Sequence, residues 1–261
     1  MHPIHRVDDD GHPRYAVRDD GVWRALDGDP FGACSPGAPL ANQSPRPLAP
    51  VVPSKIVAVG LNYKDHAAEM GKPLPAEPLI FLKPSTSVVG PEAPIVMPVG
   101  AGRVDFEAEV GVVIGRTARH VPAARAHEFV LGLTCVNDVT DRDLQRRDVQ
   151  YTRAKGFDTF APVGPCIVPL DLDVPIGVWS SVNGTRRQAS STRELIFPIR
   201  QLVEFVTSVM TLLPGDVIST GTPPGVGPLA VGDRVVVGVE GVGELGNDVV
   251  AADDAAGRSG P

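Results

Sequence analysis

The sequence predicts a β-rich α+β protein. Three observations favour this class: short apolar segments dominate the chain, 28 glycines and 27 prolines occupy about a fifth of all positions, and a strong helical repeat of apolar residues is confined to one segment. Strands that follow one another with few helices between them favour packed sheets over a doubly wound sheet. With 261 residues the chain can bury a sizeable core.

Residues 1–50 are expected to form a small N-terminal domain and linker, because they are polar, rich in proline and glycine and only weakly periodic. Within them, residues 14–17 and 22–26 flank Asp19-Asp20-Gly21, a pattern typical of a β-hairpin. Residues 36–53 are interpreted as a linker. The second domain is therefore placed at residues 51–261, with a disordered tail from about residue 253.

The second domain begins with a short buried strand at residues 55–60, followed by two helical turns at residues 63–70. The clearest helix covers residues 198–213, where apolar residues recur at the spacing of one helix face and Pro198 suits the first position. Further strands are expected at residues 78–84, 104–114, 131–136, 217–220, 234–239 and 248–251.

The composition excludes several classes of protein. There are 31 acidic and 24 basic residues, which give a net charge of −7, and no lysine and arginine cluster suggests a nucleic acid or an anionic membrane as partner. No apolar stretch approaches the roughly 20 residues that span a bilayer, and the N-terminus lacks the apolar core of a signal peptide. Three cysteines without CxxC spacing indicate reduced thiols and a cytoplasmic protein.

Three acidic residues alternate with apolar ones in the expected strand at residues 104–114. Residues two apart in a strand share a face, so Asp105, Glu107 and Glu109 are expected on one side. One interpretation is a solvated acidic face above a dry core face. The other is a metal site, because like charges at this spacing repel one another and a bound cation would relieve the repulsion.

Asp138 follows the expected strand at residues 131–136 and is a candidate for the same site. The alternative is that this region caps a polar helix at residues 141–149. If Asp138 joins Glu107 and Glu109, the site consists of oxygen donors only. Such a site selects Mg²⁺, Mn²⁺ or Ca²⁺ over zinc and leaves positions free for water and substrate.

His66 and Glu69 are neighbours if residues 63–70 form a helix, because they are three positions apart. A carboxylate that orients an imidazole makes a general base near neutral pH. The alternative is an ordinary charge pair on a surface helix. The adjacent residues 71–75 fit either a mobile cover or a plain loop.

Seven motifs then occur in an order that is specific as a set, although each one alone is weak. They are VAVGLNY at residues 57–63, FLKP at 81–84, DFEAE at 105–109, NDVT at 137–140, KGFDTF at 155–160, VNG at 182–184, and PGD with GTP between 214 and 223. The chain resembles the fumarylacetoacetate hydrolase family in its smaller bacterial form, of the acylpyruvate hydrolase or 2-hydroxyhepta-2,4-diene-1,7-dioate isomerase kind. The resemblance covers about residues 50–250.

The resemblance implies layered, partly rolled sheets and a homodimer. It implies that Glu107, Glu109 and Asp138 hold Mg²⁺ or Mn²⁺, with Ca²⁺ a weaker candidate, and that Asp105 supports them. It gives His66 and Glu69 as a water-activating pair in a closing lid and Lys155 as a contact of the substrate's enolate or carboxylate end. The remaining substrate contacts that it implies are Arg142, Gln145, Thr222 and Lys83. Asp141 stands where the family often has alanine and adds a negative charge beside Arg142.

The implied activity is metal-dependent hydrolysis of a carbon–carbon bond in a 2,4-dioxo acid, which leaves pyruvate as an enolate that the ion and Lys155 stabilise. The same site suits isomerisation of a hydroxydienoate or decarboxylation of oxaloacetate. An alternative of another class is a non-catalytic dicarboxylate binder. An intact set of Glu107, Glu109, Asp138 and Lys155 argues against a binder and favours an enzyme that acts on a 2-oxo acid.

Overall fold

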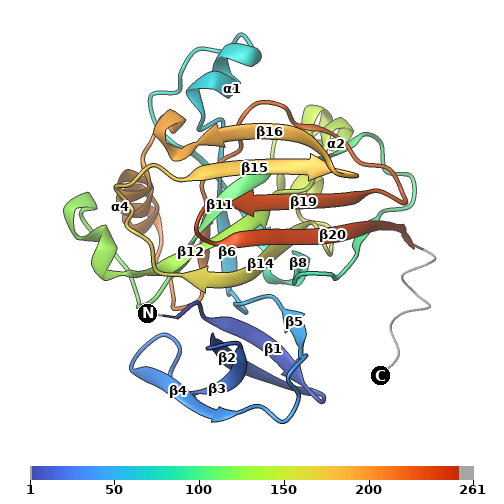
Figure 1. The fold of residues 1–261 in the computed structure, drawn as a ribbon. Helices are drawn as coiled ribbons and strands as arrows, with labels where there is room; N and C mark the ends of the chain where they lie inside the picture. The colour runs from blue at the N-terminus through green and yellow to red at the C-terminus, as the bar shows by residue number, and fades with distance from the viewer. Residues whose placement is uncertain (1, 253–261) are drawn as a thin grey trace.

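A computed structural model describes residues 2–252, and the disordered tail predicted from residue 253 lies outside these residues. Two sheets pack face to face in the main body, and a separate N-terminal sheet lies below them in Figure 1. The prediction of a β-rich α+β fold is confirmed. Within the described residues, no helix is long and apolar enough to cross a membrane.

The N-terminal sheet has the strand order β4-β3-β2-β1-β5. Its strands are β1 (His5–Asp9), β2 (His12–Asp19), β3 (Val22–Gly28), β4 (Cys34–Pro39) and β5 (Arg46–Leu48). The predicted hairpin is confirmed, because β2 and β3 pair antiparallel and Asp19 lies opposite Val22. The prediction of a plain linker at residues 36–53 is wrong in part, since β4 extends into this range and β5 lies within it. An antiparallel bridge from Ile4 to Ile167 joins this sheet to the main body.

The larger main sheet has the order β7-β6-β17-β11-β12-β14-β8. Its strands are β6 (Lys55–Gly60), β7 (Leu79–Pro84), β8 (Val88–Val89), β11 (Ala108–Ile114), β12 (Val130–Asn137), β14 (Ala161–Val168) and β17 (Val217–Ser219). The second main sheet has the order β16-β15-β19-β20-β9. Its strands are β9 (Ile95–Met97), β15 (Gly177–Val182), β16 (Thr185–Ser191), β19 (Arg234–Val239) and β20 (Gly243–Ala251).

The main core lies between these two sheets (Figure 1). Alternating strand residues such as Val110 and Val112 of β11 meet Val237 and Val239 of β19 across the interface, and all four are buried. Because successive side chains point to opposite sides of a strand, the residues between these valines face away from the core between the two sheets.

A third, small sheet has the order β13-β10-β18, with β10 (Val104–Phe106), β13 (Thr140–Asp141) and β18 (Gly227–Pro228). The predicted continuous strand at residues 104–114 is therefore wrong, because it divides at Glu107 into β10 and β11, which belong to different sheets. The division has a physical cause: the backbone groups of Glu107 bond to the Asn137 side chain and the Asp138 N–H instead of a regular ladder.

Helices are short and few in the described part of the chain. They are α1 (Lys64–Glu69), α2 (Arg142–Arg147), α3 (Thr152–Lys155), α4 (Ile199–Val209) and the 3-10 turns η1 (Ser85–Ser87), η2 (Ala123–Glu128) and η3 (Thr192–Glu194). The helix predicted at residues 198–213 is confirmed as α4 but ends four residues earlier. Met210 is extended, and Leu212 bonds to Ala118 instead of continuing the helix. The chain between α1 and β7 projects from the top of the body in Figure 1.

Candidate active site

A cavity of about 590 Å³ contains most of the residues predicted to be functional. Their side chains come from α1, the β10–β11 segment, the end of β12, α2, α3 and the loop after β17. The predicted residues that line it are His66, Glu69, Glu107, Glu109, Asp138, Arg142, Gln145, Lys155 and Thr222. Lys83 lies behind the wall, where its ammonium contacts Asp138.

Glu107, Glu109 and Asp138 are brought together at the centre of this cavity. Each can offer one carboxylate oxygen such that these oxygens lie within 4.8 Å of one another. All three residues are buried, as is Asp105. The interpretation of this strand as a solvated acidic face is therefore wrong. The break at Glu107 contributes to the convergence, because side chains two apart in a regular strand start about 6.6 Å from one another.

Lys155 lies against two of these carboxylates. Its Nζ donates to Glu107 Oε2 at 2.9 Å, to Asp138 Oδ2 at 2.6 Å and to the hydroxyl of Thr140 at 2.8 Å. An ammonium has three hydrogens, so these contacts use all of them. Lys155 can donate to a ligand only when one of these contacts opens, but its charge acts on the cavity in either state.

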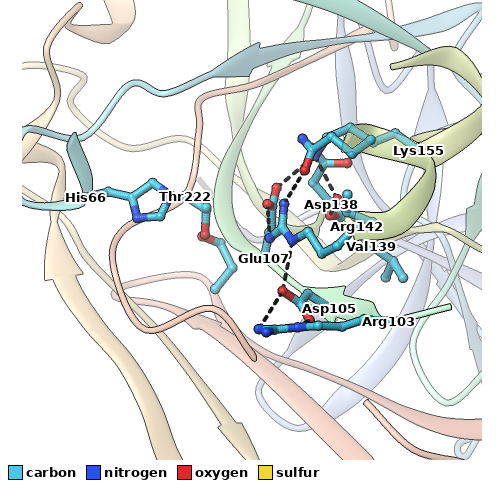
Figure 2. A network of polar contacts seen from close by, with 12 residues as sticks. His66, Arg103, Asp105, Glu107, Asp138, Val139, Arg142, Lys155 and Thr222 are labelled. Carbon is cyan, nitrogen blue, oxygen red and sulfur yellow. Dashed lines mark hydrogen bonds and ion pairs between the residues drawn. The ribbon is translucent and has the colours of Figure 1, made fainter. Parts of the chain in front are cut away.

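Two further cations approach the cluster from other parts of the chain. Lys83 on β7 has no solvent-exposed surface and donates from Nζ to Asp138 Oδ1 at 2.5 Å. Arg142 on α2 donates from Nε to Asp105 Oδ2 at 2.8 Å and from a terminal nitrogen to Glu107 Oε1 at 2.5 Å. Figure 2 shows Arg142 between Asp105 and Glu107, with Lys155 and Asp138 on the far side.

Asp105 supports Arg142 and does not face the three central carboxylates as a fourth partner. Arg103 makes two further bonds to it, of 2.8 and 3.1 Å, so Asp105 is held between two guanidinium groups (Figure 2). A terminal nitrogen of Arg142 also donates to Gln145 Oε1 at 2.8 Å. The arginines therefore separate Asp105 from the other three acidic residues. These three, Glu107, Glu109 and Asp138, are called the inner set below.

The protonation of the inner set follows from these neighbours. Burial alone would raise the pKa of Glu107, but the charges of Lys155 and Arg142 outweigh burial and lower this pKa to about 2. Burial lowers the pKa of Lys83 despite the contact with Asp138. Burial also opposes the charge on Lys155, but Asp138 and Glu107 outweigh it and raise the pKa of Lys155.

Glu109 differs from the other two carboxylates. Ser219 Oγ and the backbone N–H of Gly221 both donate to its Oε2, at 2.6 and 2.8 Å, and no cationic side chain of residues 2–252 forms an ion pair with it. Burial and the charges of Asp138 and Glu107 raise the pKa of Glu109 to about 8. The negative charges of Asp138 and Glu107 and the burial of Glu109 therefore favour the protonated form of this carboxyl, and a cation bound to it would take the place of that proton.

These residues fit a hard divalent cation. The donors are carboxylate oxygens from three residues, they converge within 4.8 Å, and one of them lacks a cationic partner among the described residues. Oxygen-only sets of this kind suit Mg²⁺ or Mn²⁺. A bound cation would compete with Lys155 for Glu107 and Asp138, because both would use the same carboxylates.

The alternative that Asp138 only caps a helix is wrong, because Asp141 has that role. Asp141 is the cap of α2, since its Oδ1 accepts from the backbone N–H groups of Asp143 and Leu144 at 2.9 and 3.0 Å. Asp138 instead points to Lys83 and Lys155. The charge of Asp141 is therefore engaged at the helix end, and the guanidinium of Arg142 bonds to Asp105 and Glu107.

His66 lines the same cavity from α1. Its Nδ1 lies 2.9 Å from Glu69 Oε2, and the predicted contact between the two residues is confirmed. The helix is attached to the body by Ser190 Oγ, which donates to Asp65 Oδ2 at 2.8 Å, and by the Gly225 N–H, which donates to Glu69 Oε1 at 3.3 Å. Figure 2 shows His66 beside Thr222, across the cavity from Lys155.

Sequence reasoning missed Gln188, which lies directly behind Thr222. Its Nε2 donates to Thr222 Oγ1 at 2.8 Å, and it is 1% exposed. Gln188 is the only buried member of β16, whose sequence TRRQASS is mostly polar and whose other residues are partly or fully exposed. A polar residue in a polar strand gives no signal of burial, so only the packing of the second sheet against β11 locates it.

The comparison with protein families decides the assignment. Residues 55–250 match the family model described as fumarylacetoacetate (FAA) hydrolase C-terminal. The chain belongs to the fumarylacetoacetate hydrolase family. The resemblance seen in the sequence motifs is thereby confirmed, and the match includes every predicted site residue.

Three solved structures show which members of the family the chain is similar to. A 2-hydroxyhepta-2,4-diene-1,7-dioate isomerase from Mycobacterium marinum is 41% identical, with a TM-score of 0.88 over 97% of this chain and 99% of that one. A fumarylacetoacetate hydrolase from Exiguobacterium antarcticum is 34% identical, with a TM-score of 0.87 over 96% and 100%. A fumarylpyruvate hydrolase from Pseudomonas aeruginosa, in complex with Mn²⁺ and pyruvate, is 31% identical, with a TM-score of 0.72 over 81% and 93%.

These fumarylacetoacetate hydrolase relatives are named as hydrolases and isomerases, so the family is one of enzymes with both kinds of reaction. Their folds match this chain over nearly its whole length in two of the three cases. The expectation of the family's layered, β-rich fold is confirmed. The family relationship alone does not distinguish the two reactions, and the choice between them depends on the residues of this cavity.

Proposed function

We propose that the protein is a hydrolase that cleaves a carbon–carbon bond in 2,4-dioxo acids of the acylpyruvate or fumarylpyruvate type and that it requires Mg²⁺ or Mn²⁺. The observation that carries the proposal is that one cavity holds both an inner set of three buried carboxylates and a carboxylate-bound histidine. The similar fumarylpyruvate hydrolase that binds Mn²⁺ and pyruvate supports it.

Glu107, Glu109 and Asp138 would hold the cation. When bound, it would supply Lewis-acid polarisation of the substrate's carboxylate and 2-oxo oxygens. Arg142 and Gln145 lie on the same side of the cavity and offer N–H groups to a substrate carboxylate. Because Arg142 already bridges Asp105 and Glu107, its guanidinium is held in one orientation before substrate enters.

His66 would act as the general base. Glu69 accepts from the Nδ1 side of the ring, which leaves Nε2 free to take a proton from water. The oxygen of that water then bonds to the C4 carbonyl carbon of the substrate, and the C3–C4 bond breaks. Its electron pair passes to the pyruvate fragment as an enolate, and protonation at C3 gives pyruvate beside a carboxylic acid.

Lys155 would stabilise the enolate by its charge. Its Nζ is buried, and its pKa is raised by Asp138 and Glu107, so it stays protonated through the reaction. A fixed charge in a water-poor cavity stabilises developing negative charge more than it would in solvent. Lys83, behind Asp138, adds a second positive charge that needs no contact with the substrate.

The test is turnover of a panel of acylpyruvates with and without MgCl₂ or MnCl₂, with pyruvate measured by reduction with NADH and lactate dehydrogenase. Cation-dependent release of pyruvate from at least one 2,4-dioxo acid is expected, and a chelator should abolish it. Absence of pyruvate from the whole panel in the presence of either cation would refute the proposal.

One observation favours a second candidate, isomerisation of a hydroxydienoate. The similar isomerase from Mycobacterium marinum shares more identity and more of its length with this chain than the fumarylpyruvate hydrolase does. Isomerisation needs proton transfer but no attacking water. Loss of the absorbance of the conjugated hydroxydienoate without pyruvate release would identify this reaction.

A further inference from the structure

One face of β7 leads from the inner set of carboxylates to the mouth of the cavity. Alternate residues of a strand share a face, so Lys83, Phe81 and Leu79 point to the same side of β7. Lys83 contacts Asp138, and the ring centroid of Phe81 lies 4.9 Å from Nζ of Lys155. The exposed fraction rises along this row, from 0% at Lys83 to 52% at Leu79. The row therefore runs from the buried site outward to solvent.

The outer part of this row belongs to a wall of apolar side chains. Leu79 and Phe81 line the cavity together with Tyr151 and with Met70, which directly follows Glu69 at the end of α1. The rings of Phe81 and Tyr151 meet edge to face, with centroids 5.5 Å apart. Met70 is 46% exposed, so two of the four side chains present much of their apolar surface to solvent. Exposed apolar side chains that border a cavity are typical of a ligand-binding surface. These four residues, Met70, Leu79, Phe81 and Tyr151, are called the apolar wall.

The cations at the mouth offer weak recognition of a charged ligand group. Arg103 makes two bonds to Asp105, and Arg146 pairs with Asp143. Lys72 also lines the cavity, and it is exposed. An exposed ion pair contributes little, because water solvates both charges well when they are apart. A carboxylate bound to Lys72 would therefore gain less than an apolar group that covers the wall.

The proposed reaction places the substrate along the same row. In that reaction the pyruvate part lies at the inner set beside Lys155, and C4 faces His66. The acyl chain on C4 then extends away from the inner set, past Phe81 and toward Leu79, which is about 6.6 Å further along the strand. Gly60, opposite Leu79 on β6, lines the cavity as well and has no side chain to fill this space.

We propose that the apolar wall selects 2,4-dioxo acids whose C4 carries an apolar acyl chain, with Leu79 as a specificity-determining residue. This inference rests on the proposed function and narrows its substrate class. A chain that covers the wall removes its apolar surface from water, which is favourable in proportion to the area. A chain that ends in a carboxylate would lose part of its hydration at the same place, with the exposed Lys72 as its partner.

Valerylpyruvate and succinylpyruvate are matched probes of this inference. They share the 2,4-dioxo acid part and have tails of similar length, but one tail ends in a methyl group and the other in a carboxylate. Acetylpyruvate, which has only a methyl group on C4, is the reference. With saturating MnCl₂, kcat/KM for valerylpyruvate is expected to exceed that for acetylpyruvate about tenfold or more, because each buried CH₂ group contributes about fourfold. Succinylpyruvate should not exceed acetylpyruvate.

Two leucines of β7 provide a variant and its control. Leu79→Asn keeps the size of the side chain and removes its apolar surface. The ratio of kcat/KM for valerylpyruvate to that for acetylpyruvate should fall about fourfold or more, and the ratio cancels any general loss of active protein. Leu82, which is 46% exposed, lies on the opposite face of the strand and outside the cavity lining. Leu82→Asn should keep the wild-type ratio.

Equal kcat/KM for valerylpyruvate and acetylpyruvate overturns the inference, as does an unchanged ratio in Leu79→Asn. A preference for succinylpyruvate over valerylpyruvate overturns it as well, and loss of that preference in Lys72→Met would identify the partner of the carboxylate. These results leave the proposed function intact, because the wild type still cleaves acylpyruvates. Absence of pyruvate from all three acids in the presence of Mg²⁺ or Mn²⁺ refutes the proposed function and this inference with it.

Discussion

The Nδ1 atom of His66 lies 2.9 Å from Oε2 of Glu69, one helical turn further along α1. His66 lies on the side of the cavity opposite Lys155, so the group that would activate water and the group that would stabilise the enolate lie on opposite sides of the cavity (Figure 2). Only Glu69 is substantially exposed; the histidine ring is buried against the body.

His66→Ala is expected to lower kcat for acylpyruvate hydrolysis by about 10²–10⁴-fold, because that is the usual contribution of a general base. Glu69→Gln should have a smaller effect, since the ring stays in place and loses only its charged partner. His127→Ala, which changes a histidine outside this cavity, is the control and should keep full activity. Steady-state kinetics with a saturating cation measure all three, and wild-type kcat in His66→Ala would remove the assigned base.

Glu109→Gln is expected to abolish cation binding while the protein still folds. The substitution removes the carboxylate that has no cationic partner among the described residues and keeps its shape. Even an outer partner of a metal ligand is worth about 10–100-fold in affinity, so loss of a ligand should cost more. In thermal unfolding, MnCl₂ should raise the Tm of the wild type and not that of the variant.

The matched control for that experiment is Glu244→Gln, which removes an exposed carboxylate from β20. It should respond to MnCl₂ as the wild type does. A cation-dependent rise in Tm that survives in Glu109→Gln would show that the ion binds elsewhere or without this residue.

Gly221→Ala is expected to destabilise the protein more than Gly232→Ala. Both glycines have positive φ, of 97° and 96°, so either alanine is strained by about 1–3 kcal/mol. A Cβ at Gly221 would also lie 2.8 Å from Cβ of Asn62, whereas nothing lies within 4 Å of one at Gly232. Urea unfolding midpoints give the difference, and equal midpoints would mean that the crowding at Asn62 relaxes without cost.

The N-terminal sheet should lose stability in acid through His5. Burial and the charge of Arg18 lower the pKa of His5 to about 4, below the value of about 6.5 in an unfolded chain. Between these values the unfolded state binds the proton first, so the stabilisation is complete above about pH 6.5 and is lost as the pH falls toward 4.

His5→Phe keeps an aromatic ring against Trp23, 4.9 Å away in the wild type, and removes the titration. Between pH 7 and pH 4.5, the free energy of unfolding of the wild type should fall by up to about 2–3 kcal/mol more than that of this variant. Substitution of the exposed His12 by Gln is the control. Equal acid sensitivity of wild type and His5→Phe would assign the effect to other groups.

Patterns within a single element were sufficient to predict much of this fold. The alternation at residues 108–114, the repeat on α4 and the turn between Asp19 and Val22 are properties of neighbouring residues, and each produced the expected element. Motif order then predicted the family. The ends of the elements were less predictable, because Leu212 leaves the helix to bond with Ala118.

The electrostatics of the cavity could not be predicted in this way. The carboxylate of Asp138 is neutralised by Lys83, which is 55 positions away, and by Lys155, which is 17 away. Neither lysine belongs to the strand that was predicted at residues 104–114. From that strand alone, its acidic residues could be interpreted only as a solvated face or as a metal site. The burial of Gln188 could not be predicted for the same reason, since its partner Ala108 is 80 positions away.

The side chain of Asn137 takes the place of a missing strand neighbour, because its Oδ1 accepts from the Glu107 N–H at the point where β10 and β11 separate. A regular strand through Glu107 would keep the carboxylates further apart, and the Asn137 amide supplies the backbone hydrogen bond that Glu107 lacks where the strand is interrupted. In the proposed cation site, the geometry of the three carboxylates would depend on this uncharged neighbour on another strand as well as on the carboxylates themselves.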